Sequence, residues 1–384
     1  MRFFFVLSAV LLIALLNGPA NCQTPSSPAS PGGQLIEKVI PAPSLSHNLF
    51  EIPSEDLIAV YLPPSYETSG KRYPVVYFLP GFGDAVRYYT LYAVFQGFSL
   101  KGSMDRLVQE NKVRETIVVI VNGTTFLGGS FYVNSPVTGN WEDLVTKDVV
   151  SYVDGNYRTL ARPESRGIAG HSMGGYGALN IAMRRPDLFG VVYAMSPGLF
   201  DEKGLSSSFM FSDQASIDSY LKFEKELVSI NEAEARVKFM SRICYMNMVL
   251  SELDRSFVYA YGAAFAPDPR GKVPYINYPY KTVGGHAALD STSWRQFENG
   301  FGGLPEKVNR YKDNLLRLRA IAVDYGTQDE NPWIPAGCAY FSDLLKKAGV
   351  RHEILTFEGR HNDKIRERLE NSVLPFFSTS LSYE

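Results

Sequence analysis

The sequence predicts an α/β fold, in which a mostly parallel β-sheet carries helices on both faces. Two observations lead to this prediction. Short apolar, strand-like runs alternate with helix-like runs along the chain, as in repeated β–α units. One strand-to-helix junction also holds Gly170-His171-Ser172-Met173-Gly174, a serine framed by two glycines. The 384 residues can bury a sizeable core and exceed a typical single domain, so we expect an insertion within one fold.

The Gly-x-Ser-x-Gly segment has the context of a nucleophile elbow, because a strand-like run precedes it and a helix-like run follows it. Gly170 and Gly174 carry no Cβ and leave room for the backbone to fold back on itself. Ser172 then lies at the apex of the turn, in front of the partially positive N-terminus of a helix. The alternative is a glycine-rich turn with an incidental serine, and the partner residues described next argue against it.

An acid for a catalytic triad is expected after the serine and before the histidine. The apolar run 319–323 is predicted to be a buried strand, and it leads into a loop with three carboxylates. A triad acid must reach the imidazole from just past its strand end, which places Asp324 too close to the strand. We therefore predict Asp329 as the acid and keep Glu330 as the alternative.

His361 is predicted to be the general base, because it lies in the loop after the last strand-like run, 352–357, and before a charged helix beginning near Asp363. The chain has five histidines, so its competitors are few. His171 lies within the elbow and is expected to pack beside it and to contact the substrate. The other three are in the N-terminal region, in an inserted region and at the start of a strand: His47, His286 and His352.

An oxyanion hole is expected at the turn Pro80-Gly81-Phe82-Gly83-Asp84, which follows the apolar strand 75–79. Backbone N–H groups in such a turn can point at a developing oxyanion, with the N–H after the nucleophile as the second donor. We assign these roles to the backbone of Phe82 and Met173. The alternative is an ordinary Pro-Gly turn that closes a strand.

Several linked motifs carry a resemblance to a known family. They are Tyr61-Leu62-Pro63-Pro64-Ser65-Tyr66, Arg72-Tyr73-Pro74-Val75-Val76-Tyr77-Phe78-Leu79-Pro80-Gly81, Gly139-Asn140-Trp141-Glu142-Asp143, Tyr157-Arg158-Thr159, the elbow, and Arg185-Pro186-Asp187-Leu188-Phe189-Gly190. Over roughly residues 55 to 200 the chain resembles the esterase D type of esterases, which includes feruloyl esterases, S-formylglutathione hydrolases and mycolyltransferases. The resemblance implies an α/β-hydrolase fold and acyl transfer chemistry, and it places Ser172, Asp329 and His361 in the triad.

The chain departs from compact members of that family between Ser196 and Arg319, where well over a hundred residues intervene. We expect a helical cap insertion over about 200–309, within a hydrolase domain spanning 36–384. Aromatic residues and methionines of this insertion form either an adaptable acyl pocket or the core of the cap itself. Tyr132 and Trp141 pose the same choice between lining the site and packing beneath it, and we predict both as substrate-binding residues.

The N-terminus resembles an export signal. Arg2 is followed by an apolar run, 3–16, that is too short to span a bilayer, and Ala20-Asn21-Cys22 fits a small-x-small cleavage site. We therefore predict a signal peptide over 1–22, with lipidation of Cys22 as the less favoured alternative. Residues 23–35, rich in Pro and Ser, form a linker. The predicted location is secreted or periplasmic, without a stable membrane span.

The remaining composition narrows the partners. The formal net charge of −2, with no basic cluster, argues against nucleic acid. No C-x-x-C or H-x-x-x-H spacing suggests a metal, and the predicted chemistry requires no cofactor. Cys244 and Cys338 either form one disulfide in an oxidising compartment or remain two free thiols.

Taken together, these features predict a serine esterase that hydrolyses carboxylic esters through an acyl-enzyme intermediate. Its substrate is expected to be a small-molecule or polysaccharide ester, with acyl or feruloyl groups on polysaccharides suggested by export and by the resemblance. Two alternatives stay open. An acyltransferase would use the same triad with an alcohol acceptor, and a non-catalytic binding protein would keep only the fold.

Overall fold

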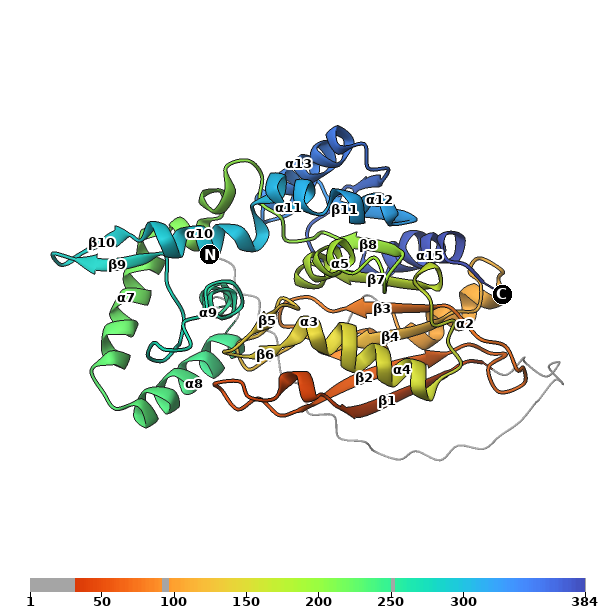
Figure 1. Ribbon diagram of the computed structural model, residues 1–384, viewed down its shortest axis with the longest axis horizontal. Coiled ribbons are helices and arrows are strands. Elements are labelled where there is room, and N and C mark those ends of the chain that lie inside the picture. Colours follow the sequence, from red (N-terminus) through yellow and green to blue (C-terminus); the bar gives the residue numbers. More distant parts are fainter. Residues whose placement is uncertain (1–31, 92–96, 250–252, 384) are drawn as a thin grey trace, which may run out of the picture.

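The computed structural model describes residues 32–91, 97–249 and 253–383. Its centre is an eight-stranded sheet in the order β1-β2-β4-β3-β7-β8-β11-β12 (Figure 1). The antiparallel neighbours are β1 with β2 and β2 with β4, and all other neighbours are parallel, as predicted. The strands are β1 Gln34–Pro41, β2 Glu55–Leu62, β3 Val75–Leu79, β4 Ile117–Val121, β7 Arg166–His171, β8 Val191–Met195, β11 Ala320–Gly326 and β12 Glu353–Phe357.

The central strands are buried on both faces, which explains why they are continuously apolar in sequence. Successive side chains of a strand point to opposite faces. In β3, Val75, Tyr77 and Leu79 join one hydrophobic core, whereas Val76 and Phe78 join the other. A parallel sheet of this kind is therefore stable only when helices cover both of its faces.

Helices cover both faces of the sheet (Figure 1). One face packs against α2, α14 and α15, and the other against α4, α5 and α13. Segments of π-helix over Leu144–Val149 and Leu369–Val373 join α3 to α4 and α14 to α15. The helices are α1 Val86–Thr90, α2 Leu100–Gln109, α3 Trp141–Asp143, α4 Val150–Asn156, α5 Met173–Arg184, α13 Trp333–Ala348, α14 Ile365–Arg368 and α15 Leu374–Ser380. The structure also has a two-stranded hairpin, formed by β5 Asn134–Ser135 and β6 Gly139–Asn140. It has 3₁₀ turns at Pro43–Leu45, Pro163–Ser165 and Gly204–Ser207.

The connection between β8 and β11, residues 196–319, is mostly helical; we call it the β8–β11 segment. Much of it lies beside one end of the sheet, away from the C-terminus (Figure 1). Its elements are α6 Phe209–Ser212, α7 Gln214–Val228, α8 Glu232–Met248, α9 Leu253–Phe265, β9 Tyr280–Val283, β10 His286–Leu289, α10 Ser291–Phe301, α11 Leu304–Arg310 and α12 Lys312–Arg317. α7 ends at Val228, and Asn231 starts the next helix, α8, by accepting the Glu234 N–H.

The predicted signal peptide, 1–22, lies outside the described residues, and β1 begins at Gln34, within the predicted linker. Across 32–91, 97–249 and 253–383, no helix is both long and apolar enough to cross a bilayer.

Cys244 is exposed and Cys338 is buried, and both are free thiols. Of the two alternatives for the cysteines, the structure therefore shows the unpaired one.

A buried ion pair joins the carboxyl ends of β8 and β11 to α14. Arg368 donates to both carboxylate oxygens of Asp324, at 2.5 and 3.4 Å, and to the Ser196 hydroxyl at 3.0 Å. Its guanidinium carbon also lies 4.4 Å from the centre of the Phe357 ring. The side chains of Arg368 and Asp324 are 5% and 4% exposed, so neither charge can be rehydrated if its partner is lost.

Arg368→Met should therefore destabilise the protein by about 3–5 kcal/mol, because it leaves the Asp324 carboxylate buried without a counter-charge. Urea denaturation followed by circular dichroism measures this free energy of unfolding. Arg366→Met, on the same helix, is the matched control. Arg366 forms a more exposed pair with Glu370, and its loss should cost less than about 1 kcal/mol. Equal effects of the two variants would contradict the role assigned to the buried pair.

A second buried carboxyl, Asp56 at the start of β2, forms no ion pair with any residue that the structure describes. Its Oδ1 accepts a hydrogen bond of 2.8 Å from the Asn122 amide, and its Oδ2 is buried without a partner among the described residues. Burial raises the pKa of Asp56 from 3.8 to about 7, although the hydrogen bonds from Asn122 and from the Leu57 N–H oppose the shift. The folded state thus holds this proton more tightly than the unfolded chain does.

The contribution of Asp56 to stability is consequently present in full below about pH 3.8 and is lost as the pH rises towards about 7. Asp56→Asn should remove this loss. The free energy of unfolding of the variant, relative to that of the wild type, should therefore rise by roughly 4 kcal/mol between pH 4 and pH 8. Urea denaturation across this pH range tests it, with Asp343→Asn on exposed α13 surface as the control. The idea fails if wild type and Asp56→Asn show the same pH dependence.

Candidate active site

The carboxyl ends of the central parallel strands open into a pocket of about 340 Å³, where α/β sheets usually bind ligands. The turns after β3, β7, β11 and β12 all contribute to it, together with helices of the β8–β11 segment. It is lined by Gly81, Phe82, Asp84, His171, Ser172, Met173, Gly198, Phe209, Met210, Phe257, Phe301, Glu330, Asn331, Trp333, Ile334, His361 and Asn362.

Ser172 occupies the sharp turn between β7 and α5, with φ 55° and ψ −115°. A positive φ is unfavourable for a residue with a Cβ and persists only where the surroundings enforce it. Here a Cβ at Gly174 would overlap the Leu79 carbonyl, and one at Gly170 would overlap Gly174 itself. The Ser172 N–H also donates to the Met195 carbonyl of β8 at 2.8 Å. The two glycines therefore let the turn close, and the neighbouring strands hold it strained.

The structure brings His361 and Asp329 together. His361 Nδ1–H donates to Asp329 Oδ2 at 2.7 Å, which leaves Nε2 free to act as a base in the same pocket as Ser172. The side chain of Asp329 is fully buried, and its other oxygen accepts the Asn331 N–H at 2.8 Å. The carboxylate is therefore held in one orientation towards the imidazole.

The other two carboxylates of this loop have different partners. Glu330 accepts the backbone N–H of His361 at 3.1 Å, and Asp324 belongs to the buried pair with Arg368. Of the three candidates, Asp329 alone contacts the imidazole through its side chain. Glu330 instead holds the backbone of the histidine loop.

The turn after β3 is shaped by Asp84. Its Oδ2 accepts the Gly81 N–H at 3.0 Å and the Tyr89 hydroxyl at 2.8 Å, while the Gly83 N–H donates to the Gly128 carbonyl at 2.8 Å. The amide of Phe82, between them, makes no hydrogen bond within the described parts of the chain. The amide of Met173 is at the first position of α5, where N–H groups have no partner within the helix. Both predicted oxyanion donors thus remain available.

Sequence reasoning missed Asp84. Burial raises the pKa of its carboxyl, although hydrogen bonds from Tyr89 and Gly81 oppose the shift. The available signal was a carboxylate three residues after the glycine of a Pro-Gly turn, a spacing at which Asp side chains close turns onto backbone N–H groups. Asp84 therefore acts as a positioning residue for the turn that carries Phe82.

His171 packs beside the histidine loop. Its Nε2 donates to the His361 carbonyl at 3.3 Å, and the same carbonyl accepts from Arg368 at 3.4 Å. Burial lowers the pKa of His171 well below its usual value, with the nearby His361 and Arg368 adding to the effect, so the ring stays neutral. His171 lines the pocket, although it is only 2% exposed, and its contact with a substrate stays a prediction.

Tyr132 and Trp141 do not line this pocket, which corrects the prediction of a substrate-binding role. Both are at most 1% exposed. The Tyr132 hydroxyl donates to the Pro80 carbonyl at 3.1 Å, and Trp141 Nε1 donates to the Thr138 carbonyl at 2.8 Å. Their aromatic bodies fill the core and their polar ends find backbone acceptors, so packing was the correct alternative.

The remaining histidines take no part in the pocket. His352 bonds to the Ser342 hydroxyl at 2.7 Å and to the Val350 carbonyl at 3.0 Å, and His286 is exposed on β10. His47 lies in the turn before β2 with a φ of 61°. Within the described residues, no group of three His, Cys, Asp or Glu side chains is placed to hold a metal ion.

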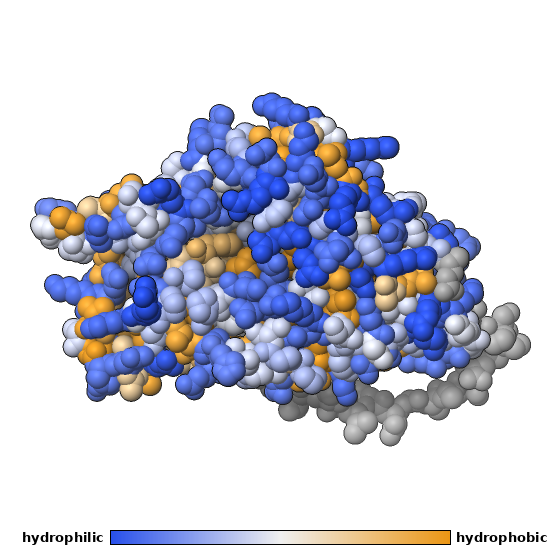
Figure 2. Space-filling view, viewed as in Figure 1, coloured by the Kyte–Doolittle hydropathy of each residue, from blue (hydrophilic) through white to orange (hydrophobic). Residues whose placement is uncertain are grey.

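The β8–β11 segment supplies an apolar wall to the pocket through Phe209, Met210, Phe257 and Phe301. Figure 2 shows hydrophobic residues gathered where α9 lies, on the face that is viewed. The segment also has a core of its own, in which Tyr261 is fully buried. Different aromatic residues of this segment therefore line the pocket and form the core of the segment.

Comparisons with known proteins show which proteins this chain resembles. The model of the family described as Putative esterase matches residues 51–236. Esterase Rv1288 of Mycobacterium tuberculosis is 31% identical over 132 residues, which are 33% of this chain and 26% of that protein. The endo-1,4-beta-xylanase/feruloyl esterase of Xylanibacter ruminicola is 33% identical over 147 residues, 37% of this chain and 19% of that protein. The matches thus span about a quarter or less of these relatives.

Solved structures show the same architecture over most of the chain. A ferulic acid esterase has a TM-score of 0.54 at 21% identity, covering 91% of this chain and 99% of that one. An S-formylglutathione hydrolase from Agrobacterium tumefaciens has a TM-score of 0.52 at 16% identity, covering 93% and 99%. At such identities the likeness concerns the fold. The resemblance inferred from the motifs is confirmed, and the chain is a protein of α/β-hydrolase fold that is similar to the esterases of this family.

Proposed function

We propose that this protein is a serine esterase that hydrolyses carboxylic esters through an acyl-enzyme intermediate. One observation carries the proposal: the strained Ser172 shares a pocket with His361, whose other ring nitrogen is held by the buried Asp329. The similarity to esterases of the matched family supports it. No metal or organic cofactor is needed for this chemistry.

In the proposed mechanism, His361 Nε2 takes the proton of the Ser172 hydroxyl as the oxygen attacks the ester carbonyl. Asp329 fixes the tautomer of the imidazole and stabilises the imidazolium that forms. The Phe82 and Met173 N–H groups bind the oxyanion of the tetrahedral intermediate, each worth about 3 kcal/mol. His361 then protonates the leaving alcohol, and water releases the acyl group in a second round of the same steps.

The strain at Ser172 supports a nucleophile in particular. Residues held in sparsely populated backbone conformations cost about 1–3 kcal/mol and cluster at active sites, where the geometry they produce is used. A protein that only binds its ligand gains nothing from this cost. An acyltransferase would use the same residues and differ only in admitting an alcohol acceptor in place of water.

The proposed substrates are esters outside the cytoplasm, such as acyl or feruloyl groups on polysaccharides. The predicted signal peptide over 1–22 supports export from the cell. The feruloyl esterase activity named for the Xylanibacter ruminicola relative supports the choice of acyl group. The apolar wall of the pocket suits an acyl chain or an aromatic acid.

Ser172→Ala should lower kcat for a p-nitrophenyl or hydroxycinnamate ester by at least about 10⁴-fold, because the variant has no nucleophile. Release of p-nitrophenol or of the free acid measures the rate. Ser229→Ala, at the exposed end of α7, is the control and should keep full activity. If Ser172→Ala retains activity, or the wild type hydrolyses no member of an ester panel, the proposed function is wrong.

Asp329→Asn should reduce kcat by about 10⁴-fold with little change in KM, because an amide favours the wrong imidazole tautomer. Glu330→Gln is the matched control on the neighbouring residue. Its amide oxygen can still accept the His361 N–H, so the loss should stay below about tenfold. A larger loss from Glu330→Gln than from Asp329→Asn would assign the acid to Glu330 instead.

A further inference from the structure

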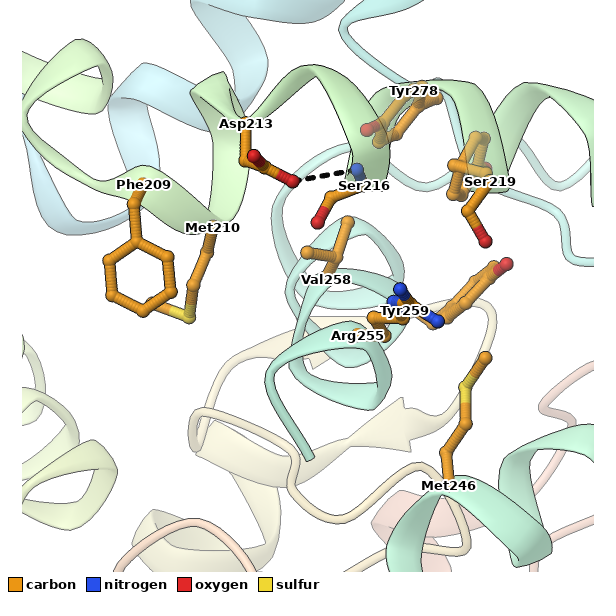
Figure 3. A pocket seen from close by; sticks show the side chains of 11 residues that line it. Phe209, Met210, Asp213, Ser216, Ser219, Met246, Arg255, Val258, Tyr259 and Tyr278 are labelled. Atoms are coloured by element: carbon orange, nitrogen blue, oxygen red, sulfur yellow. Dashed lines mark hydrogen bonds between the residues drawn. The ribbon is translucent and has the colours of Figure 1, made fainter. Parts of the chain in front are cut away.

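The Ser172 pocket has two chemically different sides. Its apolar side lies on the β8–β11 segment, where Phe209 and Met210 of α6 line both the pocket and an adjoining cavity (Figure 3). Its polar side lies on the loops after β11 and β12, where Glu330 and Asn362 line it. The two parts of an ester bound at Ser172 therefore meet different surroundings.

The alcohol part of the ester is the part that meets the polar side. In the proposed mechanism His361 Nε2 protonates the leaving oxygen, so this oxygen lies within hydrogen-bond reach of the imidazole. The carboxylate of Glu330 is held beside the same residue, because its Oε2 accepts the His361 backbone N–H at 3.1 Å. The substituent on the leaving oxygen therefore lies nearer to Glu330 than the acyl group does.

The acidic and basic residues on the pocket wall are of one sign. Among the described residues that line the pocket, Asp84 and Glu330 are acidic, and none is a lysine or an arginine. Asp84 is directed into the turn after β3, where its Oδ2 accepts the Gly81 N–H and the Tyr89 hydroxyl. Glu330 is exposed, so its charge faces an incoming substrate.

A cation lies on the apolar side instead, in the adjoining cavity. Arg255 of α9 lines that cavity together with Asp213 (Figure 3). Hydrogen bonds from Ser216 lower the pKa of Asp213, and the charge of Arg255 adds to this effect. Arg255 is thus near an acidic group of its own and does not line the Ser172 pocket. It therefore does not offset the charge of Glu330 where the alcohol part lies.

We propose that Glu330 determines the charge specificity of the esterase, favouring esters of neutral or cationic alcohols over esters of alcohols that carry a negative charge. This inference rests on the function proposed above and specifies its substrate class. A negative charge on the alcohol is repelled by the carboxylate of Glu330, and no cationic side chain on the described pocket wall compensates. Of the proposed polysaccharide esters, those on neutral chains are therefore favoured over those on chains rich in uronic acids.

Three acetate esters of similar size test the proposal. They are para-acetoxybenzoate, which is anionic, its methyl ester, which is neutral, and para-acetoxyphenyl-trimethylammonium, which is cationic. The measurement is kcat/KM of the wild type and of Glu330→Gln at low ionic strength. Glu330→Gln should raise the anionic-to-neutral ratio about three- to tenfold and lower the cationic-to-neutral ratio by a similar factor. The intrinsic reactivity of each ester cancels, because each ratio is compared between two enzymes.

The opposite signs of the two changes separate an electrostatic role from a structural one. Glu330→Gln keeps an oxygen that accepts the His361 N–H, and a disturbed loop would alter all three rates by a common factor. Salt provides a second measurement on the wild type itself. The Debye length falls from about 30 Å at 0.01 M to about 3 Å at 1 M, so added salt should move both ratios in the directions expected for Glu330→Gln.

Glu358→Gln is the matched control. Glu358 is an exposed carboxylate in the loop after β12, accepts the Gln328 amide at 3.3 Å and does not line the pocket. Its loss should leave both ratios within about twofold. The proposal is refuted if Glu330→Gln changes the ratios no more than Glu358→Gln does, or if both ratios move in the same direction. A wild type that hydrolyses none of the three esters contradicts the proposed function, whereas hydrolysis of the neutral ester with unchanged ratios contradicts this inference alone.

Discussion

The proposed active site depends on the close approach of three backbone segments around Gly174. The carbonyl of Leu79, at the end of β3, occupies the space that a side chain at position 174 would need, and Gly170 is packed just as closely. This contact fixes the start of α5 against the sheet, and Ser172 must adopt a positive φ to connect β7 with it. The same contact sets the distance between Ser172 and the turn of Phe82. Both proposed oxyanion donors are therefore positioned by one steric constraint.

The histidine loop is held from several directions at once. The side chain of His361 donates to Asp329, and its backbone N–H donates to Glu330. Its backbone carbonyl accepts from His171 and Arg368. Three of these four partners are ionisable groups buried by their surroundings, so their geometry depends on complete pairing. Such a loop can rotate the imidazole only slightly. That rigidity suits the role proposed for His361, which takes the proton of Ser172 and then donates it to the leaving alcohol from the same position.

Local sequence patterns predicted the elements that position Ser172, Asp329 and His361, because strand ends, glycine turns and chain order are local signals. The strands predicted at 75–79 and 319–323 and the helix after Ser172 follow from apolar runs and turn residues, and the structure has β3, β11 and α5 there. The roles of Tyr132 and Trp141 did not follow, because the burial of an aromatic side chain depends on which backbone acceptors surround it in three dimensions. Asp84 did carry a local signal, its spacing from Gly81. The apolar wall built by Phe209, Phe257 and Phe301 depends instead on contacts between distant segments, which no spacing rule encodes.

The long connection between β8 and β11 has a consequence for how the protein folds. Val191 pairs with Ala320, so two neighbouring strands of the sheet are separated by more than a hundred residues of chain. The entropy of closing so long a connection exceeds that of a four-residue loop by only about 3 kcal/mol. The long connection nevertheless raises the contact order of the protein, and a higher contact order slows folding. The pairing of β8 with β11 should therefore be a late event, and Asp329 and His361 would approach Ser172 only after the rest of the sheet has formed.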